Sequence, residues 1–105
     1  MLQFKEGVQL TITKAVNEIL RGVEAVFREF NVPCIVTAGT DGVHGKQSKH
    51  YSGEALDFRI RDLKPEQRDA LVQLCKKSLI HGHDVVLEHD HLHVEWDPKI
   101  KDNHA

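Results

Sequence analysis

The feature that most constrains the fold is a short segment of alternating polar and apolar residues, His91-Leu92-His93-Val94-Glu95-Trp96. Successive side chains of a β-strand point to opposite faces of a sheet, so this segment predicts a strand with one polar and one apolar face. The apolar face needs a layer that covers it, whereas the polar face gathers two histidines and a glutamate. The chain must therefore fold as a sheet that is packed on one side.

Two amphipathic helices are predicted to supply the covering layer. Over residues 10–30 the apolar residues recur in steps of three and four, which places them on one stripe: Ile12, Val16, Ile19, Leu20, Val23, Phe27 and Phe30. The second helix begins at Pro65, a first-turn position that proline tolerates, and Gly82 is a natural terminator after it. Its predicted buried stripe consists of Ala70, Leu71, Leu74, Cys75 and Leu79.

Further strands are predicted at residues 34–38, 54–60 and 84–87, and the last of these forms an antiparallel hairpin with 91–96. Within 54–60 the apolar residues at even positions face the core, so Asp57 is displayed on the opposite face. The predicted order is helix, strand, strand, helix, strand, strand. This order is typical of an α+β domain with a small, mostly antiparallel sheet and two main helices.

Length and composition narrow the class of protein. The chain has 105 residues, which predicts a single domain, with residues 97–105 as a loose polar tail. The formal net charge of -2 argues against a nucleic-acid partner. No apolar run approaches the roughly 20 residues that span a bilayer, and no signal peptide is visible. We therefore expect a monomer that is made in the cytoplasm and has no membrane partner.

Both cysteines, Cys34 and Cys75, fall in apolar segments, which predicts buried free thiols. A disulfide is the alternative, for which the sequence offers no argument. The chain has no CxxC pair, so the cysteines are not expected to bind a metal.

Histidines are concentrated in one part of the chain: of eight, seven lie between His44 and His93. Histidine is the commonest metal ligand, so this concentration indicates a site. His50 and Asp57 are seven residues apart, and Ser52-Gly53 between them permits a sharp turn that lets the two converge. Alone, each motif has an ordinary interpretation: His50 can be a solvated loop histidine, Asp57 a paired aspartate, and 91–96 a half-buried edge strand. Together they provide three protein ligands, which is the number typical of a catalytic zinc site.

The combined motif Ser48-x-His50-x-x-Gly53-x-Ala55-x-Asp57, followed by His91-x-His93, resembles a family of zinc peptidases. This family includes D-alanyl-D-alanine carboxypeptidases and the L-alanyl-D-glutamate endopeptidases of phage lysins. The segment 42–57, with Glu88 and the last motif, also resembles the amino-terminal signalling domain of hedgehog proteins, which shares that fold. The resemblance covers roughly residues 36–96 and implies the peptidase/hedgehog-like fold.

The resemblance implies one zinc ion held by His50, Asp57 and His93. His91 is the alternative third ligand, because Glu88-x-x-His91 matches the spacing from base to ligand in some relatives. Zinc itself is inferred from the ligand types, and other divalent metals can fill such a site.

The resemblance also implies catalytic roles. Glu88 matches the general base, and His91 matches the histidine that stabilises the transition state or shuttles protons. His44 matches a further active-site histidine of the hedgehog-like relatives. Ser48 and Glu95 are candidates for orienting the ligand imidazoles.

One departure from the peptidase pattern concerns substrate binding. Many of these peptidases carry a substrate-binding arginine after the first strand. The corresponding stretch here, residues 37–41, has none, and His44 or Gln47 are the alternatives.

The implied activity is hydrolysis of peptide bonds in peptidoglycan stem peptides, with the cell wall or periplasm as the site of action. The sequence does not choose between the D-Ala-D-Ala and the L-Ala-D-Glu bond. Two alternatives remain: a catalytically silent, zinc-dependent binding module and a different zinc hydrolase such as an amidase. The other histidines, His81, His83, His89 and His104, are expected on the surface.

Overall fold

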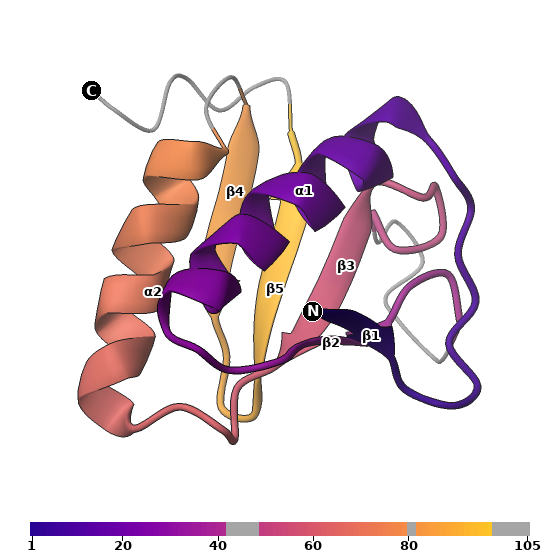
Figure 1. The fold of residues 1–105 in the computed structure, drawn as a ribbon. Coiled ribbons are helices and arrows are strands. Elements are labelled where there is room, and N and C mark those ends of the chain that lie inside the picture. Colours follow the sequence, from indigo (N-terminus) through magenta and orange to yellow (C-terminus); the bar gives the residue numbers. More distant parts are fainter. Residues whose placement is uncertain (42–48, 80–81, 98–105) are drawn as a thin grey trace.

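The computed structural model describes residues 1–41, 49–79 and 82–97. Within these ranges the elements are β1 (Leu2–Phe4), α1 (Lys14–Glu29), β2 (Cys34–Ala38), β3 (Ala55–Arg59), α2 (Pro65–Ser78), β4 (His83–Leu87) and β5 (His91–Trp96). The strands form one sheet, and both helices pack on the same side of it (Figure 1). Among the described residues, neither helix is long and apolar enough to span a membrane.

The sheet is mixed, with the strand order β1-β2-β3-β5-β4. β1 pairs with β2 in parallel, whereas the pairs β2–β3, β3–β5 and β4–β5 are antiparallel. The α+β class and the two helices are confirmed, but the expectation of a mostly antiparallel sheet is corrected to a mixed one. The sequence did not predict β1, because this edge strand has three residues, of which Gln3 and Phe4 are exposed, so that no alternation marks it.

Helix α1 is shorter than the predicted span of 10–30. The hydroxyl of Thr13 accepts a hydrogen bond from the backbone N–H of Val16 (3.0 Å) and caps the helix, so residues 10–12 lie outside it. Ile12 is accordingly 71% exposed, which corrects its place in the buried stripe, while Val16, Ile19, Val23 and Phe27 are buried as predicted. The Thr13 hydroxyl also donates to the carbonyl of Gly53 (2.7 Å), which fastens the helix start to the turn before β3.

Helix α2 begins at Pro65 as predicted, and Leu71, Cys75 and Leu79 are buried. Ala70 is exposed, which corrects its assignment to the buried stripe. Neighbouring helix residues are about 100° apart around the axis. Ala70 is therefore turned away from the stripe that Leu71 and Cys75 define.

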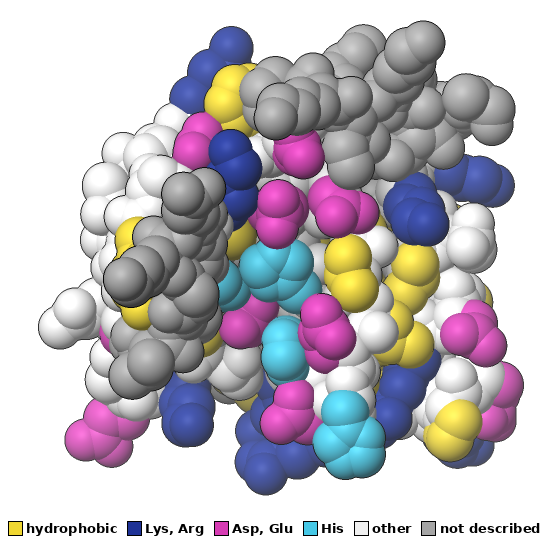
Figure 2. Space-filling view, turned by 180° about the vertical axis from the view of Figure 1, so that it is seen from behind, with side chains coloured by type: hydrophobic (Ala, Val, Ile, Leu, Met, Phe, Trp, Pro, Cys, Tyr) yellow, Lys and Arg dark blue, Asp and Glu magenta, His cyan; other side chains and the backbone are white. Residues whose placement is uncertain are grey.

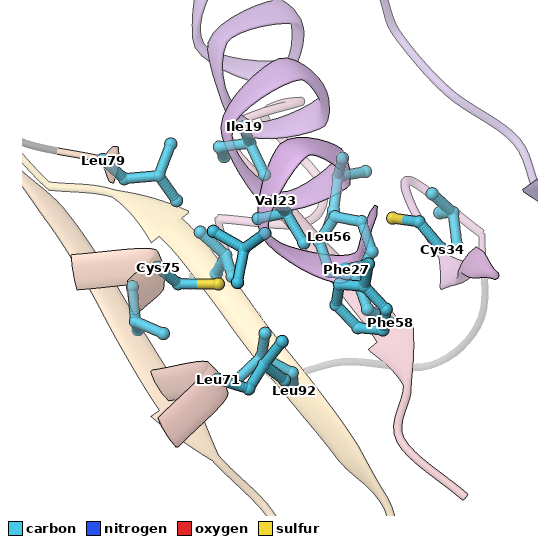
Figure 3. Close-up of a cluster of buried hydrophobic side chains, with 14 of the residues drawn as sticks. Ile19, Val23, Phe27, Cys34, Leu56, Phe58, Leu71, Cys75, Leu79 and Leu92 are labelled. Atoms are coloured by element: carbon cyan, nitrogen blue, oxygen red, sulfur yellow. The ribbon is translucent and has the colours of Figure 1, made fainter. Parts of the chain in front are cut away.

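The core lies between the helices and the sheet. Side chains from α1, α2, β3 and β5 meet in this layer (Figure 3), and the rings of Phe27 and Phe58 lie 6.2 Å apart between centroids. Leu56 and Leu92 are fully buried. Burial of each such side chain contributes roughly 1.5–3 kcal/mol to folding. This contribution fixes which face of β3 and β5 points inward; the other face, here called the open side, is not covered by either helix.

His83 is buried, with 2% of its surface exposed, which corrects its expected place on the surface. β4 starts at His83, one residue earlier than predicted, and alternation gives His83 the same face as the buried Val85. His89 is exposed as expected. His81 and His104 lie outside the described residues.

Both cysteines are buried free thiols, as predicted. Burial raises the pKa of Cys34 and the pKa of Cys75 to about 12. Because the folded-state pKa lies above the ordinary value, the thiols favour the folded state at low pH. This contribution is lost as the pH rises from about 9 towards about 12.

We expect the folded protein to react with a thiol-labelling disulfide reagent on the order of a thousandfold more slowly at pH 8 than the unfolded chain does, because the thiolate is the nucleophile. The measurement is the labelling rate with and without denaturant, followed from pH 8 to pH 10. Rapid stoichiometric labelling of the folded protein at pH 8 would contradict the buried placement of both thiols.

Candidate metal centre

Three side chains converge on the open side of the sheet: His50, Asp57 and His93. His50 Nε2 lies 3.1 Å from Asp57 Oδ1 and 3.2 Å from His93 Nδ1, and Asp57 Oδ1 lies 2.9 Å from His93 Nδ1. His50 and Asp57 are buried, and His93 is half-buried. Two imidazole nitrogens and one carboxylate oxygen thus face a common point, and such a group can hold a metal ion.

The fold positions each of the three. Asp57 in β3 pairs directly with His93 in β5, and residues opposite each other in neighbouring strands share a face of the sheet. His50 reaches them from the turn before β3. The backbone N–H of Gly53 donates to the carbonyl of His50 (3.1 Å), and Gly53 has a φ of +72°, which favours glycine over other residues.

Hydrogen bonds on the outer side orient both imidazoles. The carbonyl oxygen of Gly39 lies 2.9 Å from His50 Nδ1, and the carboxylate oxygen of Glu95 lies 2.8 Å from His93 Nε2. Both oxygens can only accept, so each of these ring nitrogens carries the proton. In the neutral imidazoles, His50 Nε2 and His93 Nδ1 then carry lone pairs that face Asp57, the arrangement that metal-binding histidines adopt, whereas without a metal a proton can take the place of the ion between His93 and Asp57.

The charges in this group stabilise one another. Burial acts to raise the pKa of Asp57, but hydrogen bonds from His50 and His93 outweigh it, so the pKa of Asp57 lies well below its usual range. Burial acts to lower the pKa of His93, whereas hydrogen bonds to Asp57 and Glu95 raise it, to about 9. Asp57 is therefore a carboxylate at neutral pH, the form in which it can bind a cation.

The geometry separates the two alternatives for the third ligand. His93 belongs to the converging group, whereas His91 Nε2 lies 3.7 Å from Asp57 Oδ1. The other nitrogen of His91, Nδ1, lies 2.6 Å from Asp90 Oδ1. His91 is thus a neighbour of the group rather than part of it.

The other predicted site residues are only partly brought together. Glu88 is exposed and follows β4, and its backbone N–H donates to the carbonyl of His91 (2.9 Å). Alternation along the hairpin gives Glu88 the same face as Val86, which pairs with His93. His44, Gln47 and Ser48 lie outside the described residues. Histidine and acidic side chains gather on this face of the molecule (Figure 2).

Two neighbours of the site were not predicted, Gly39 and Asp90. The pairing of β2 with β3 shifts register between Val36 and Ala38, just before the Gly39 carbonyl that contacts His50. Irregularities of this kind are common beside functional sites, but a backbone acceptor leaves no side-chain pattern in a sequence. The contact of Asp90 with His91 joins adjacent residues, so no spacing could reveal it.

Gly39 is also a point of close approach between two chain segments. A Cβ atom at this position would lie 2.3 Å from the carbonyl oxygen of Gln9 and 2.5 Å from Leu10 Cδ2. The same Gln9 carbonyl accepts the backbone N–H of Thr40 (2.7 Å). A side chain at Gly39 must therefore displace either the segment at Gln9 or the carbonyl that orients His50.

Replacing Glu95 should weaken metal binding. We expect Glu95→Ala to lower the affinity for zinc by about 10- to 100-fold, because His93 loses the acceptor that fixes its tautomer. Glu95→Gln retains a carbonyl acceptor and should lose less. The measurement is a competition titration with a chromophoric chelator, with Glu29→Ala on the exposed end of α1 as the control. Equal affinities in Glu95→Ala and the control would contradict the role of Glu95.

Gly39→Ala should lower both stability and zinc affinity, with a loss in the free energy of unfolding of about 1–3 kcal/mol, typical of forced overpacking. Thr40→Ser is the control, because it keeps both donors to the Gln9 carbonyl. Denaturant unfolding and zinc titration are measured on both variants. Wild-type values for Gly39→Ala would show that the close approach does not constrain the site.

Comparison with known proteins supplies no family for this chain. No protein-family model matches it, and no curated protein matches it in sequence.

Proposed function

We propose that the chain is a zinc metallopeptidase that hydrolyses peptide bonds of peptidoglycan stem peptides in the cell wall or periplasm. The bond is of the D-Ala-D-Ala carboxypeptidase or the L-Ala-D-Glu endopeptidase type, and the fold is the one shared with hedgehog signalling domains. The observation that carries the proposal is the convergence of His50 Nε2, Asp57 Oδ1 and His93 Nδ1 on the open side of the sheet. The substrate class comes from the resemblance of the motifs.

A catalytic centre fits this group better than a structural one. The described residues contribute three donors, whereas structural zinc sites usually have four protein ligands. His93 is half-buried, so the group is accessible from the open side of the sheet. Zinc, when bound, lowers the pKa of a water ligand to about 7 and so makes hydroxide available at neutral pH.

Glu88 is the candidate general base. Its carboxylate is exposed and follows β4 on the face that carries His93. A carboxylate at this position can take up the proton of the attacking water and pass it to the leaving amine. The role requires proton transfer only, so the loss of Glu88 should leave the metal ligands in place.

His91 is the candidate for stabilising negative charge on the carbonyl oxygen of the scissile bond. Its Nδ1 is held by Asp90 (2.6 Å), and its Nε2 is directed to the neighbourhood of Asp57 (3.7 Å). In its doubly protonated form this ring donates from Nδ1 to Asp90 and can donate a second hydrogen bond from Nε2 to the carbonyl oxygen. Loss of one such donor typically lowers the rate about 100- to 1000-fold.

The test is a digest of purified peptidoglycan by zinc-loaded protein, with and without chelator, analysed by mass spectrometry. We expect new fragments that disappear with chelator and whose masses identify the bond. Glu88→Gln should retain one zinc per chain and lose about 100- to 10,000-fold in rate, the usual contribution of a general base.

The control for Glu88→Gln is Glu29→Gln, the same change at an exposed position of α1. Full activity in Glu88→Gln would refute its assignment as the base. Protein that holds one zinc but yields no fragments would favour the silent binding module, and fragments cut at the sugar–peptide amide would favour an amidase.

A further inference from the structure

A groove on the open side of the sheet leads away from the candidate metal centre. It has a volume of about 790 Å³, and its walls include Asp57 of the centre, the neighbouring His91, and Arg61 and Arg68 beyond the end of β3. Lys5, which follows β1, forms part of another wall. A ligand held at the metal centre can therefore extend along this groove.

The groove is rich in cationic side chains, although the chain as a whole has a net charge of -2. Lys5, Arg59, Arg61 and Arg68 all line it, and Arg59 is paired with Asp62 (2.7 Å). Within residues 1–41, 49–79 and 82–97, the other three form no ion pair. Lysine and arginine side chains lie beside the lower histidines in the view of this face (Figure 2).

Arg68 also carries a buried donor atom in the wall of this groove. Its Nε atom is buried and has no hydrogen-bond partner among the described residues. A buried donor without an acceptor is unfavourable, and such groups in folded proteins are nearly always satisfied. The atom therefore indicates an acceptor that the described part of the chain does not provide.

The acidic side chains in the groove are already engaged. Asp57 contacts His50 and His93, and Asp90 contacts His91. Among the described residues, neither carboxylate forms an ion pair with Lys5, Arg61 or Arg68. A planar guanidinium with a free donor suits a carboxylate, which it can bind through two parallel hydrogen bonds.

We propose that this groove is a subsite for a carboxylate of the substrate, with Arg68 as its principal partner and Lys5 and Arg61 as supporting charges. The identification of the ligand as a peptide rests on the proposed function; the preference for a carboxylate rests on the groove alone. Occupation of the groove places an acidic group of the peptide to one side of the metal centre and so selects which bond reaches it.

The first test uses glutarate, a small dicarboxylate, and glutaramide, its neutral diamide, titrated into isotope-labelled protein and followed by NMR. We expect glutarate to bind and glutaramide not to bind. Arg68→Gln should weaken glutarate binding by about tenfold or more, as expected for a lost hydrogen bond to a charged group. The whole chain is used both zinc-loaded and after chelation, because binding that disappears with the metal would place glutarate on the ion and overturn the proposal.

The matched control is Arg21→Gln, the same charge change at an exposed position of α1. Circular dichroism establishes that each variant is folded. Arg61→Gln provides a second variant of the subsite, at an exposed position in the connector between β3 and α2 rather than in a helix. Glutarate binding that is equal in Arg68→Gln, Arg61→Gln and Arg21→Gln would overturn the proposal.

The second test separates this inference from the proposed activity. Synthetic stem peptides with free or amidated carboxylates are compared, and Arg68→Gln should raise KM about tenfold for the free acid and leave KM unchanged for the amide. If cleavage has the same KM for the free acid and the amide, and for wild type and Arg68→Gln, the subsite is overturned but the proposed peptidase activity is supported. Arg68-dependent glutarate binding with no cleavage of any peptide would support the subsite and reject the peptidase.

Discussion

The register between β3 and β5 is the constraint on which both the core and the candidate metal centre depend. Asp57 lies opposite His93, and in the same register Phe58 lies opposite Leu92. A slip of one residue in either strand would turn its side chains to the opposite face, placing polar groups in the core and apolar groups at the site. Because Phe58 and Leu92 are fully buried, the hydrophobic core penalises that slip. The packing of the core therefore also holds Asp57 and His93 opposite each other, without any further interaction at the site to align them.

Much of this arrangement could be predicted from the sequence because it follows from period-two alternation. The alternation in 91–96 and around Asp57 assigns the polar residues to the open face without knowledge of the strand order. It could not choose between His91 and His93, which share that face. The choice depends on which residue lies opposite Asp57, and register is a tertiary property. The Gly39 carbonyl was unpredictable for a related reason, since a backbone acceptor is available at every residue and only the folded chain selects one.

The errors in the predicted fold have physical causes in local context. Ile12 has the spacing of the α1 stripe, but the Thr13 cap starts the helix after it. His83 was assigned to the surface by residue type, whereas its position at the inward-facing start of β4 buries it. Strand β1 is too short for its own pattern and exists because the edge of β2 offers it hydrogen bonds. In each case a neighbouring element overrides a preference of the residue itself.

The hydrogen bonds around the centre explain why this group favours a cation. Gly39 and Glu95 fix protons on the outer nitrogens of His50 and His93, so two lone pairs and the Asp57 carboxylate face one another within 3.2 Å. Three electron-rich atoms at this separation repel unless a positive charge lies among them. The pKa of His93 is raised to about 9 for the same reason, because a proton on His93 supplies a positive charge beside the carboxylates of Asp57 and Glu95. The outer hydrogen bonds therefore create a site for positive charge, and a divalent ion satisfies all three donors at once, whereas a proton joins only two.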